Sequence, residues 1–363
     1  MVGRFLIVFM LVFGFVVDGV ASPFVGSVSI SEESFRVVGS GFGAQSPLIL
    51  FDDFEYGVQG ENLYSYPNWD KWNGLKPPVF STTKPYAGSQ SAFYKLGEST
   101  TDDFHGVGAS FAPQSEIYVS FYIWWADTTD SNGDPAANLK FSRLNTDTLY
   151  NGVPLLLFTY QPQKDNNILG PQQIVYNAGS KYITYYVNGG DRFDISPNKW
   201  HRMEIYWKRG TNNDGAYYYY SDFDDSDSDA SYKTGITTVD DGSTGINRFL
   251  MEVSATGVDM SNPPDAWIDN VYISSGQSRV ELCNSSSWGT RSRCEPQIIT
   301  SWKEDEILFD LNGGGFSAGE SVYLFVVDSE NRLSKSYGPL IVPSGKATTG
   351  GIEPPFLKQP ITK

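Results

Sequence analysis

The sequence predicts an all-β protein built around a two-sheet sandwich, and three observations lead to this fold class. Gly (36 residues) and Pro (20 residues) are common in the 363-residue chain, and charged residues make up only 19%, a composition that favours turn-rich β structure. Most segments alternate apolar and polar residues and end at Gly, Pro, Asn or Asp, as strands do. No segment has a convincing helical period. Many antiparallel strands of this length indicate a sandwich.

The strands of the central block follow one another along the chain, each with period-two alternation. A turn at residues 211–215 joins two of them into a hairpin, so the four tyrosines that follow divide between two faces. The expected strands cover residues 115–125, 138–144, 153–161, 172–177, 181–189, 200–210, 215–222, 248–254 and 266–274.

The first residues have the pattern of an export signal. Arg4 supplies a positive charge, residues 5–17 form an apolar run, and small residues up to Ala21 offer a cleavage site. The run is shorter than the roughly 20 residues that a bilayer span needs, and no later segment is long and apolar enough. We therefore predict a signal peptide over residues 1–21 and a secreted or cell-surface protein without a membrane span.

The charge and the cysteines limit the possible partners and cofactors. A net charge of −16 argues against nucleic acid, whose phosphates need clustered Lys and Arg, and against anionic membrane surfaces. Export makes a disulfide between Cys283 and Cys294 the expected state of the two cysteines. A zinc site there is disfavoured because neither histidine lies near in the sequence. No G-x-S-x-G motif supports nucleophilic catalysis. No phosphate loop appears either, and we expect no organic cofactor.

The two ends of the chain flank the central block and differ from it. Residues 26–43 contain a short strand and then G-S-G-F-G, and residues 297–342 contain strands, a Gly-rich turn and a closing Y-G-P-L-I-V. These segments resemble the two parts of an IPT/TIG-type immunoglobulin-like domain. Because the first piece is too short to bury a core, we predict one split domain over residues 22–49 and 283–345, with two independent elements as the alternative. The tail, residues 346–363, is predicted to be disordered.

The central block, residues 50–282, carries a second resemblance. It begins with L-F-D-D-F-E-Y-G, continues with S-E-I-Y-V-S-F-Y-I-W-W and N-K-W-H-R-M-E-I-Y-W-K-R-G, and ends with P-D-A-W-I-D-N-V-Y-I-S. In this order the segments resemble a concanavalin A-like jelly roll, the fold of legume-type lectins, many glucanases and several polysaccharide lyases. The resemblance implies a carbohydrate ligand and leaves open whether the protein is an enzyme, since the fold serves both enzymes and binders.

Alternation gives several strands one apolar face and one face that mixes aromatic and charged side chains. Rings beside hydrogen-bonding groups suit pyranose sugars, so we interpret this second face as a concave polysaccharide-binding surface. The alternative is that these aromatics lie beneath loops or the second domain. The ligand-binding candidates are Tyr118, Tyr122, Trp124, Lys140, Arg202, Glu204, Tyr206 and Tyr218.

Catalysis has weaker support in the sequence. Glycoside hydrolysis needs two facing carboxylates, and Glu204 is the only acid on its predicted strand face. A polysaccharide lyase that acts on uronate polymers by β-elimination is harder to exclude. His201 alternates onto an apolar face, where a structural role is expected. The lyase candidates are Lys140, Gln173, Arg202, Tyr118 and His105.

Acidic side chains in the first and last strands of the central block are candidates for a structural Ca²⁺ site. Many carbohydrate-binding jelly rolls pair these strands around such an ion, which takes six to eight oxygen ligands. The Asp-rich residues 222–229 fit the EF-hand pattern poorly and are interpreted as a solvated loop. The calcium candidates are Asp52, Asp53, Glu55, Asp265 and Asp269.

Three functions therefore stay open from the sequence. The first is non-catalytic polysaccharide binding by a lectin-like jelly roll. The second is an acidic-polysaccharide lyase. The third is a surface adhesion or structural protein, suggested by the immunoglobulin-like flanks.

Overall fold

The fold is nearly all β, as predicted. The computed structural model describes residues 21–31, 34–72, 75–96, 102–126, 138–146, 156–160, 172–177, 181–186, 198–212, 214–221, 229–236, 238, 244–256 and 265–344. In these ranges the regular elements are strands apart from two short 3₁₀ turns, Leu63–Ser65 and Trp288–Thr290. No helix in the same ranges is long and apolar enough to cross a membrane. Residues 1–20 of the predicted signal peptide and the predicted tail fall outside the described residues.

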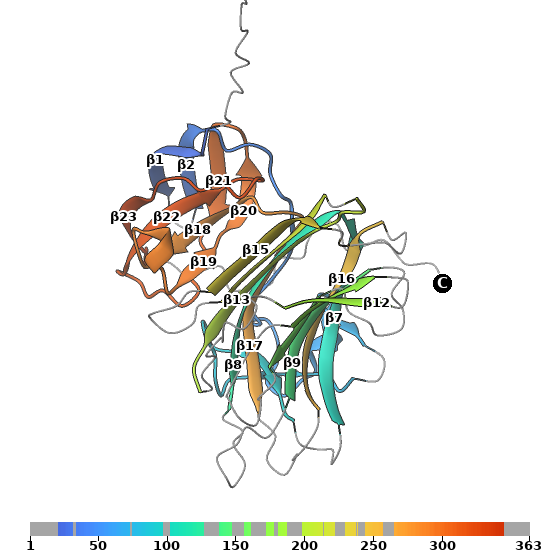
Figure 1. Cartoon of the computed structure of the whole chain (residues 1–363). Helices are drawn as coiled ribbons and strands as arrows, with labels where there is room; N and C mark the ends of the chain where they lie inside the picture. The colour runs from blue at the N-terminus through green and yellow to red at the C-terminus, as the bar shows by residue number, and fades with distance from the viewer. Residues whose placement is uncertain are drawn as a thin grey trace, which may run out of the picture.

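An eight-stranded antiparallel sheet forms one layer of the larger sandwich (Figure 1). Its strand order is β15-β14-β13-β8-β17-β6-β5, with β3 also paired to β17. Strands β13 and β14 form the hairpin that the sequence predicts. The bounds are β3 Leu48–Asp52, β5 Val79–Ser81, β6 Ser91–Tyr94, β8 Glu116–Trp125, β13 His201–Lys208, β14 Gly215–Ser221, β15 Asp229–Ile236 and β17 Ala266–Ser274.

A five-stranded sheet of order β10-β9-β16-β7-β4 forms the other layer, and β11 and β12 pair separately as a two-stranded hairpin. The strand bounds are β4 Asp70–Lys71, β7 Asp102–Gln114, β9 Asn138–Thr146, β10 Leu156–Tyr160, β11 Gln172–Asn177, β12 Lys181–Tyr186 and β16 Ile246–Thr256.

Alternating apolar side chains of the two sheets pack against each other and form one core between the layers. Ile117, Phe121 and Trp125 of β8 pack into the same buried cluster as Phe249 and Met251 of β16. Each of these side chains comes from the apolar face of its strand, because successive residues point to opposite sides of a sheet. The predicted jelly-roll sandwich is therefore confirmed as the architecture of the larger unit.

The two ends of the chain together build a second, smaller sandwich. Strand β2, near the N-terminus, pairs with β21, which lies more than 260 residues later. The sheets have the orders β1-β2-β21-β20 and β19-β18-β22-β23 and enclose a core that includes Phe35, Val37, Leu282, Phe309 and Leu324. The bounds are β1 Phe24–Ser31, β2 Ser34–Ser40, β18 Arg279–Cys283, β19 Cys294–Pro296, β20 Ile298–Trp302, β21 Glu306–Asp310, β22 Ser321–Val327 and β23 Tyr337–Ile341.

The boundary between the two sandwiches differs from the expected one. Strand β18 begins at Arg279 and pairs with β19 and β22, so the small sandwich resumes before residue 283. The reason is that the alternation R-V-E-L-C continues through the predicted boundary and directs Val280 and Leu282 into the smaller core. The IPT/TIG type of this unit stays a prediction.

The larger sandwich is inserted into the smaller one at a narrow seam. Ser275 N–H donates to the Pro47 carbonyl at 3.0 Å, and Ser278 N–H donates to Ser46 Oγ at 3.0 Å. The chain therefore leaves and re-enters the small sandwich at neighbouring points. In Figure 1 the blue and orange strands of the small sandwich lie together against one side of the larger unit.

Candidate functional site

The face predicted to bind sugar is instead the contact between the two sandwiches. Tyr118, Tyr122 and Tyr206 are 0%, 2% and 3% exposed, and Arg202 is 1% exposed. Tyr118 and Tyr206 pack in one cluster with Ile298 of the small sandwich. The alternation placed these side chains on a common face, but residues 279–298 cover that face. The buried positions of Tyr118, Tyr122 and Tyr206 match the alternative interpretation, in which these aromatic side chains lie beneath the second domain.

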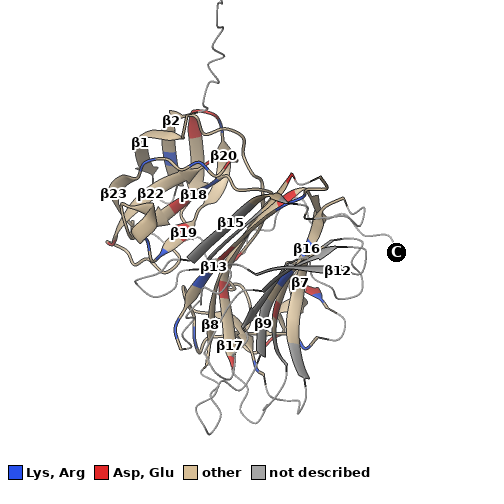
Figure 2. Ribbon diagram, viewed as in Figure 1, with Lys and Arg blue, Asp and Glu red and all other residues tan. Residues whose placement is uncertain are grey.

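Four charged side chains form a closed square at the centre of this contact, two from each sandwich. Arg202 Nη1 lies 2.7 Å from Glu281 Oε2, and Arg279 Nη2 lies 3.4 Å from Glu204 Oε2. Within each strand the pairs are Arg279 with Glu281 at 2.5 Å and Arg202 with Glu204 at 3.7 Å. Opposite charges thus alternate around the square, which we call the ion square. Figure 2 marks Lys and Arg in blue and Asp and Glu in red along the strands of both sandwiches.

Tyr118 fills the space beside the ion square. Its hydroxyl donates to Glu204 Oε2 at 2.7 Å and accepts from Arg202 Nη2 at 3.3 Å. The Arg279 guanidinium lies 4.2 Å above its ring. Burial raises the pKa of Tyr118 well above the usual value, so the hydroxyl stays a donor. Arg291 Nη2 also lies 3.7 Å from Glu204 Oε1. Buried charge pairs and hydrogen bonds of this kind favour one geometry of the contact between the sandwiches.

The same arginines set the charge state of Glu281. Burial raises the pKa of this carboxyl, but the neighbouring Arg202 and Arg279 outweigh burial and lower it to about 2. Glu281 is therefore ionised at neutral pH, as the square requires. The sequence of its strand, R-V-E-L-C, already places Arg279 and Glu281 on one face of β18, opposite the core residues Val280 and Leu282.

A second set of contacts joins β19 to the larger sandwich. Tyr122 donates its hydroxyl to the Cys294 carbonyl at 2.8 Å, and Tyr86 stacks on Tyr122 with ring centroids 3.6 Å apart. The Tyr86 hydroxyl donates to Glu295 Oε1 at 2.7 Å. Burial raises the pKa of Glu295, while the bonds from Tyr86 and the Gly315 N–H partly offset the rise.

Trp124, the remaining aromatic candidate on this face, packs away from the ion square. It is 9% exposed and meets Trp267 edge to face at 4.9 Å. Lys84 Nζ lies 3.8 Å over its ring, an ordinary cation–π contact. Tyr218 stands opposite Tyr206 in the β13–β14 ladder, but its side chain lies outside the described residues.

The residues of the predicted lyase set do not converge. Tyr118 and Arg202 lie in the eight-stranded sheet under the small sandwich, whereas Lys140 belongs to β9 of the five-stranded sheet and Gln173 to the β11–β12 hairpin. His105 lies in β7 and pairs with Val253, a core residue, and is 4% exposed. It therefore sits in a strand rather than in the polar loop expected. His201 is buried and stacks on Trp125, which fits its expected structural role.

The outer face of the five-stranded sheet presents a different set of polar side chains. Phe249, Met251 and Val253 of β16 point into the core, so Arg248 and Glu252 lie on the outer face. Around them, the ladder sets Asn145 and Ser110 on either side of Arg248, and Arg143 and Gly108 on either side of Leu250. Alternation predicted the strand 248–254 but not its register, so this face was not predictable from the sequence.

Two arginines define this outer face. The Arg248 guanidinium lies 4.6 Å from the centre of the Trp72 ring and donates from Nε to Ser110 Oγ at 3.1 Å. Arg143 binds Glu252 through two nitrogens, at 2.6 and 2.7 Å. Trp72 and Arg248 are partly exposed, and Arg143 keeps 16% of its side chain exposed. We call Trp72, Arg248, Ser110, Arg143 and Glu252 the arginine face.

The glycines of β7 let the neighbouring segment close over this sheet. A Cβ on Gly106 would lie 2.8 Å from Leu75 Cδ1 and 2.9 Å from the Met251 carbonyl oxygen. Only glycine fits such an approach without a shift of backbone. This fit allows residues 70–72 and 75–76 to lie along β7, with Trp72 beside Arg248.

The acids proposed for calcium are used largely as hydrogen-bond acceptors. Asp52 accepts from Trp69 Nε1 at 2.7 Å and from the Tyr56 hydroxyl at 2.7 Å. Asp269 accepts three backbone N–H groups, and Glu55 accepts from the N–H groups of residues 89 and 90. Asp53 accepts from the Glu55 N–H at 3.3 Å. Burial raises the pKa of Asp52, Asp265 and Asp269.

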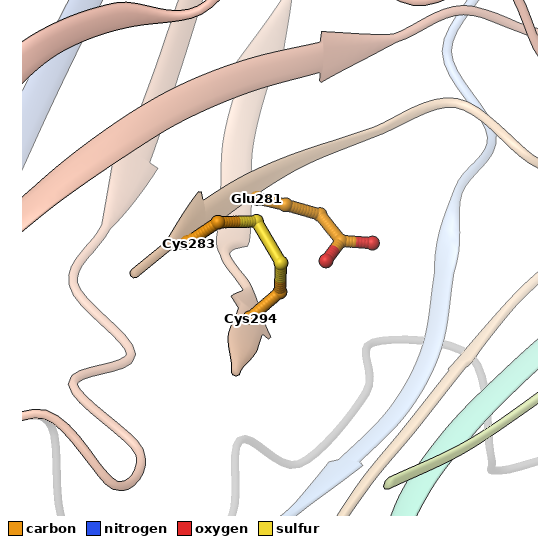
Figure 3. A group of neighbouring side chains, drawn as sticks. All are labelled: Glu281, Cys283 and Cys294. Atoms are coloured by element: carbon orange, nitrogen blue, oxygen red, sulfur yellow. A yellow bond between two sulfur atoms is a disulfide. The ribbon is translucent and has the colours of Figure 1, made fainter. Parts of the chain in front are cut away.

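These acids tie β3, β17 and the loop before β6 together, and calcium binding by them stays a prediction. In the described part of the chain, Glu281, Cys283 and Cys294 are the only metal-type side chains that gather in a group of three, within 4.8 Å. Figure 3 shows that the two cysteines of this group form the expected disulfide. Because Glu281 is also paired with Arg202 and Arg279, the group is not a metal site. The Asp-rich residues 222–228 lie outside the described residues.

Comparisons with known proteins give remote structural likenesses only. An endo-β-1,4-glucuronan lyase from the fungus Trichoderma reesei matches over 60% of this chain and 95% of its own, at 14% identity and a TM-score of 0.44. The alginate lyase Aly36B matches over 63% and 97%, at 14% identity and a TM-score of 0.44. Lectin II from Ulex europaeus matches over 63% and 99%, at 10% identity and a TM-score of 0.35. No protein-family model and no curated protein matches the chain. Likenesses this remote assign no activity to it.

Proposed function

We propose that the protein binds a polysaccharide through the arginine face of the five-stranded sheet. The observation that carries this proposal is the partly exposed Arg248–Trp72 pair, with Arg143 on the neighbouring strand. An indole edge or face packs against the C–H groups of a sugar ring, and guanidinium groups donate to hydroxyl or carboxylate oxygens. The outer face of the eight-stranded sheet, by contrast, is covered by the small sandwich.

Electrostatics support a local role for these arginines. The whole chain carries a net charge of −16, so cations that remain partly exposed on one sheet face stand out from their surroundings. Arg143 is held by Glu252 and Arg248 by Ser110 and Trp72, which orients both side chains before a ligand arrives. Such orientation lowers the entropy lost on binding.

Affinity electrophoresis through gels that contain neutral or acidic polysaccharides tests the proposal. The wild-type protein should be retarded by at least one polymer, and Trp72→Ala and Arg248→Ala should each weaken that binding about tenfold, equivalent to about 1.4 kcal/mol. Arg36→Ala is the matched control, because Arg36 is 55% exposed and pairs with Glu306 in the small sandwich. Retardation by no polymer, or equal binding by all the variants, would contradict the proposal.

A second candidate function is β-elimination on a uronate polymer. One observation favours it: Lys140 stands opposite Ser254 in the ladder, on the strand that carries Arg143, and β11 with Gln173 contacts β10. In such a reaction an arginine neutralises the uronate carboxylate and a base such as lysine removes the proton beside it. The glycosidic C–O bond then breaks, and the leaving oxygen takes up a proton. Ultraviolet absorbance of the unsaturated product should rise with acidic polymers and not with neutral ones. If absorbance does not rise with any acidic polymer but the protein is retarded in the gels, polysaccharide binding without catalysis is the function that remains.

A further inference from the structure

One hairpin of the small sandwich, β18 and β19 with their connecting loop, supplies side chains and a carbonyl that meet the larger sandwich at the ion square and at Tyr122. Strand β18 supplies Arg279 and Glu281. Strand β19 supplies the Cys294 carbonyl and Glu295, which receive the hydroxyls of Tyr122 and Tyr86. The position of this hairpin therefore decides whether the small sandwich is seated on the eight-stranded sheet.

The β19 half of the hairpin is a short edge strand. It has three residues, lies at the edge of its sheet, and ends at Pro296, which lacks an N–H. Its ladder with β18 has three residue pairs, the last of them Cys283 with Cys294. One backbone bond flanks the ladder at each end, from the Gln297 N–H to the Val280 carbonyl and from the Asn284 N–H to the Arg293 carbonyl, both at 2.9 Å. A strand this short at a sheet edge frays readily.

The disulfide joins the two strands at that last pair. Cys283 and Cys294 are 0% and 1% exposed and stand directly across the ladder (Figure 3). The loop between them brings Arg291 within 3.7 Å of Glu204 Oε1. Within the loop, Asn284 Oδ1 accepts the N–H groups of Ser292 and Arg293 at 3.1 Å. The bond thus fixes the carbonyl and the arginine that meet the larger sandwich.

We propose that the Cys283–Cys294 disulfide is a docking clasp, which keeps the small sandwich seated on the eight-stranded sheet. A dithiol that reduces it breaks the S–S bond, leaves two cysteine thiols and is itself oxidised to a disulfide. Loss of the bond lets β19 fray from β18, withdraws the Cys294 carbonyl from Tyr122 and opens the covered face.

Undocking does not require either sandwich to unfold, because each has a separate core. The larger core is lined by residues of the jelly-roll strands, and none of its described members comes from the small sandwich. The smaller core is closed by β2, β18, β21 and β22. The disulfide lies outside that core, in a separate cluster with Phe325.

Tyrosine nitration by tetranitromethane, mapped by peptide mass spectrometry, distinguishes undocking from unfolding. Tyr118, Tyr122 and Tyr206 are buried at the contact, whereas Tyr94 is buried in the larger core. The variants are Cys283→Ser/Cys294→Ser and, as a matched control, Arg36→Ala/Glu306→Ala, which removes a different cross-strand tether in the small sandwich. Wild-type protein treated with dithiothreitol provides a second route to the open bond.

We expect the nitration rates of the three contact tyrosines to rise at least about tenfold in the disulfide variant while Tyr94 stays protected. The control should nitrate like the wild type. Unchanged rates at Tyr118, Tyr122 and Tyr206 would overturn the proposal, because the contact would then hold without the bond. Equal increases at Tyr94 would also overturn it, since the bond would then maintain the whole fold.

Discussion

At the scale of single residues, Glu281 makes the contact between the sandwiches sensitive to acid. Its pKa is lowered to about 2 from the ordinary value of 4.5. A carboxyl whose folded pKa is depressed contributes stability above its unfolded pKa and loses it as the pH falls through the folded value. The contribution of Glu281 is therefore complete above about pH 4.5 and disappears toward about pH 2.

Glu281→Gln should lower the free energy of unfolding at neutral pH and flatten its decline between about pH 4.5 and pH 2. The neutral amide cannot replace the charge that faces Arg202 and Arg279. Urea unfolding at several pH values measures both effects, and the difference from the wild type removes the contributions of other titrating groups. An unchanged acid slope would show that Glu281 is not held ionised by these arginines.

The Tyr118 hydroxyl offers a second test at this scale. Tyr118→Phe removes a donor to Glu204 and an acceptor for Arg202 from a buried site. The loss should cost about 1–3 kcal/mol of unfolding free energy. Tyr66→Phe is the surface counterpart, because Tyr66 donates to Glu61 at an exposed position, and it should cost less. Equal effects in chemical denaturation would argue against the buried network.

At the scale of elements, the turn at Gly314 supports β19. Gly314 has φ +48°, and a Cβ there would lie 2.0 Å from Glu295 Cδ. Gly314→Ala should therefore displace Glu295 from Tyr86 and destabilise the fold by about 1–3 kcal/mol. Gly319→Ala, at φ +84° with nothing within 4 Å, tests the backbone strain alone and should cost less. Similar melting temperatures for the two variants would contradict the packing argument.

Strands were predictable from the sequence because alternation is a local signal. Residues 172–177 and 266–274 are strands over the predicted bounds. Alternation also placed Tyr118 and Arg202 on one face correctly. It could not show what covers that face, because the covering residues, Arg279 to Glu295, lie far away in the chain.

The arginine face was not predictable from the sequence for a related reason. Arg143, Arg248 and Trp72 come from three separate segments, and their proximity depends on strand register and on the pairing of Asp70 and Lys71 with β7. The alternation R-F-L-M-E-V of β16 already separates Arg248 and Glu252 from the core residues. Which side chains contact Arg248 and Glu252, however, depends on how β16 pairs with β7 and β9.

At the scale of the whole molecule, the ion square couples two separate cores. Arg202→Ala leaves Glu281 and Glu204 without one of their cations, and removal of one partner from a buried pair typically costs about 3–5 kcal/mol. We expect calorimetry of this variant to show two unfolding transitions in place of one, since the small sandwich would melt before the larger one. Arg36→Ala should keep the wild-type profile. A single transition, merely shifted, would show that the cores are coupled by other contacts.

The seam at which the larger sandwich is inserted also determines how the chain would carry force. Ser46 and Pro47 are hydrogen-bonded to Ser278 and Ser275. The whole jelly roll is therefore an insertion whose two ends are joined at the small sandwich. Tension applied between β1 and β23 would pass through the ladders of the small sandwich and across this seam. The sheet that carries the arginine face would lie outside the load path and keep its shape while the rest of the chain is pulled.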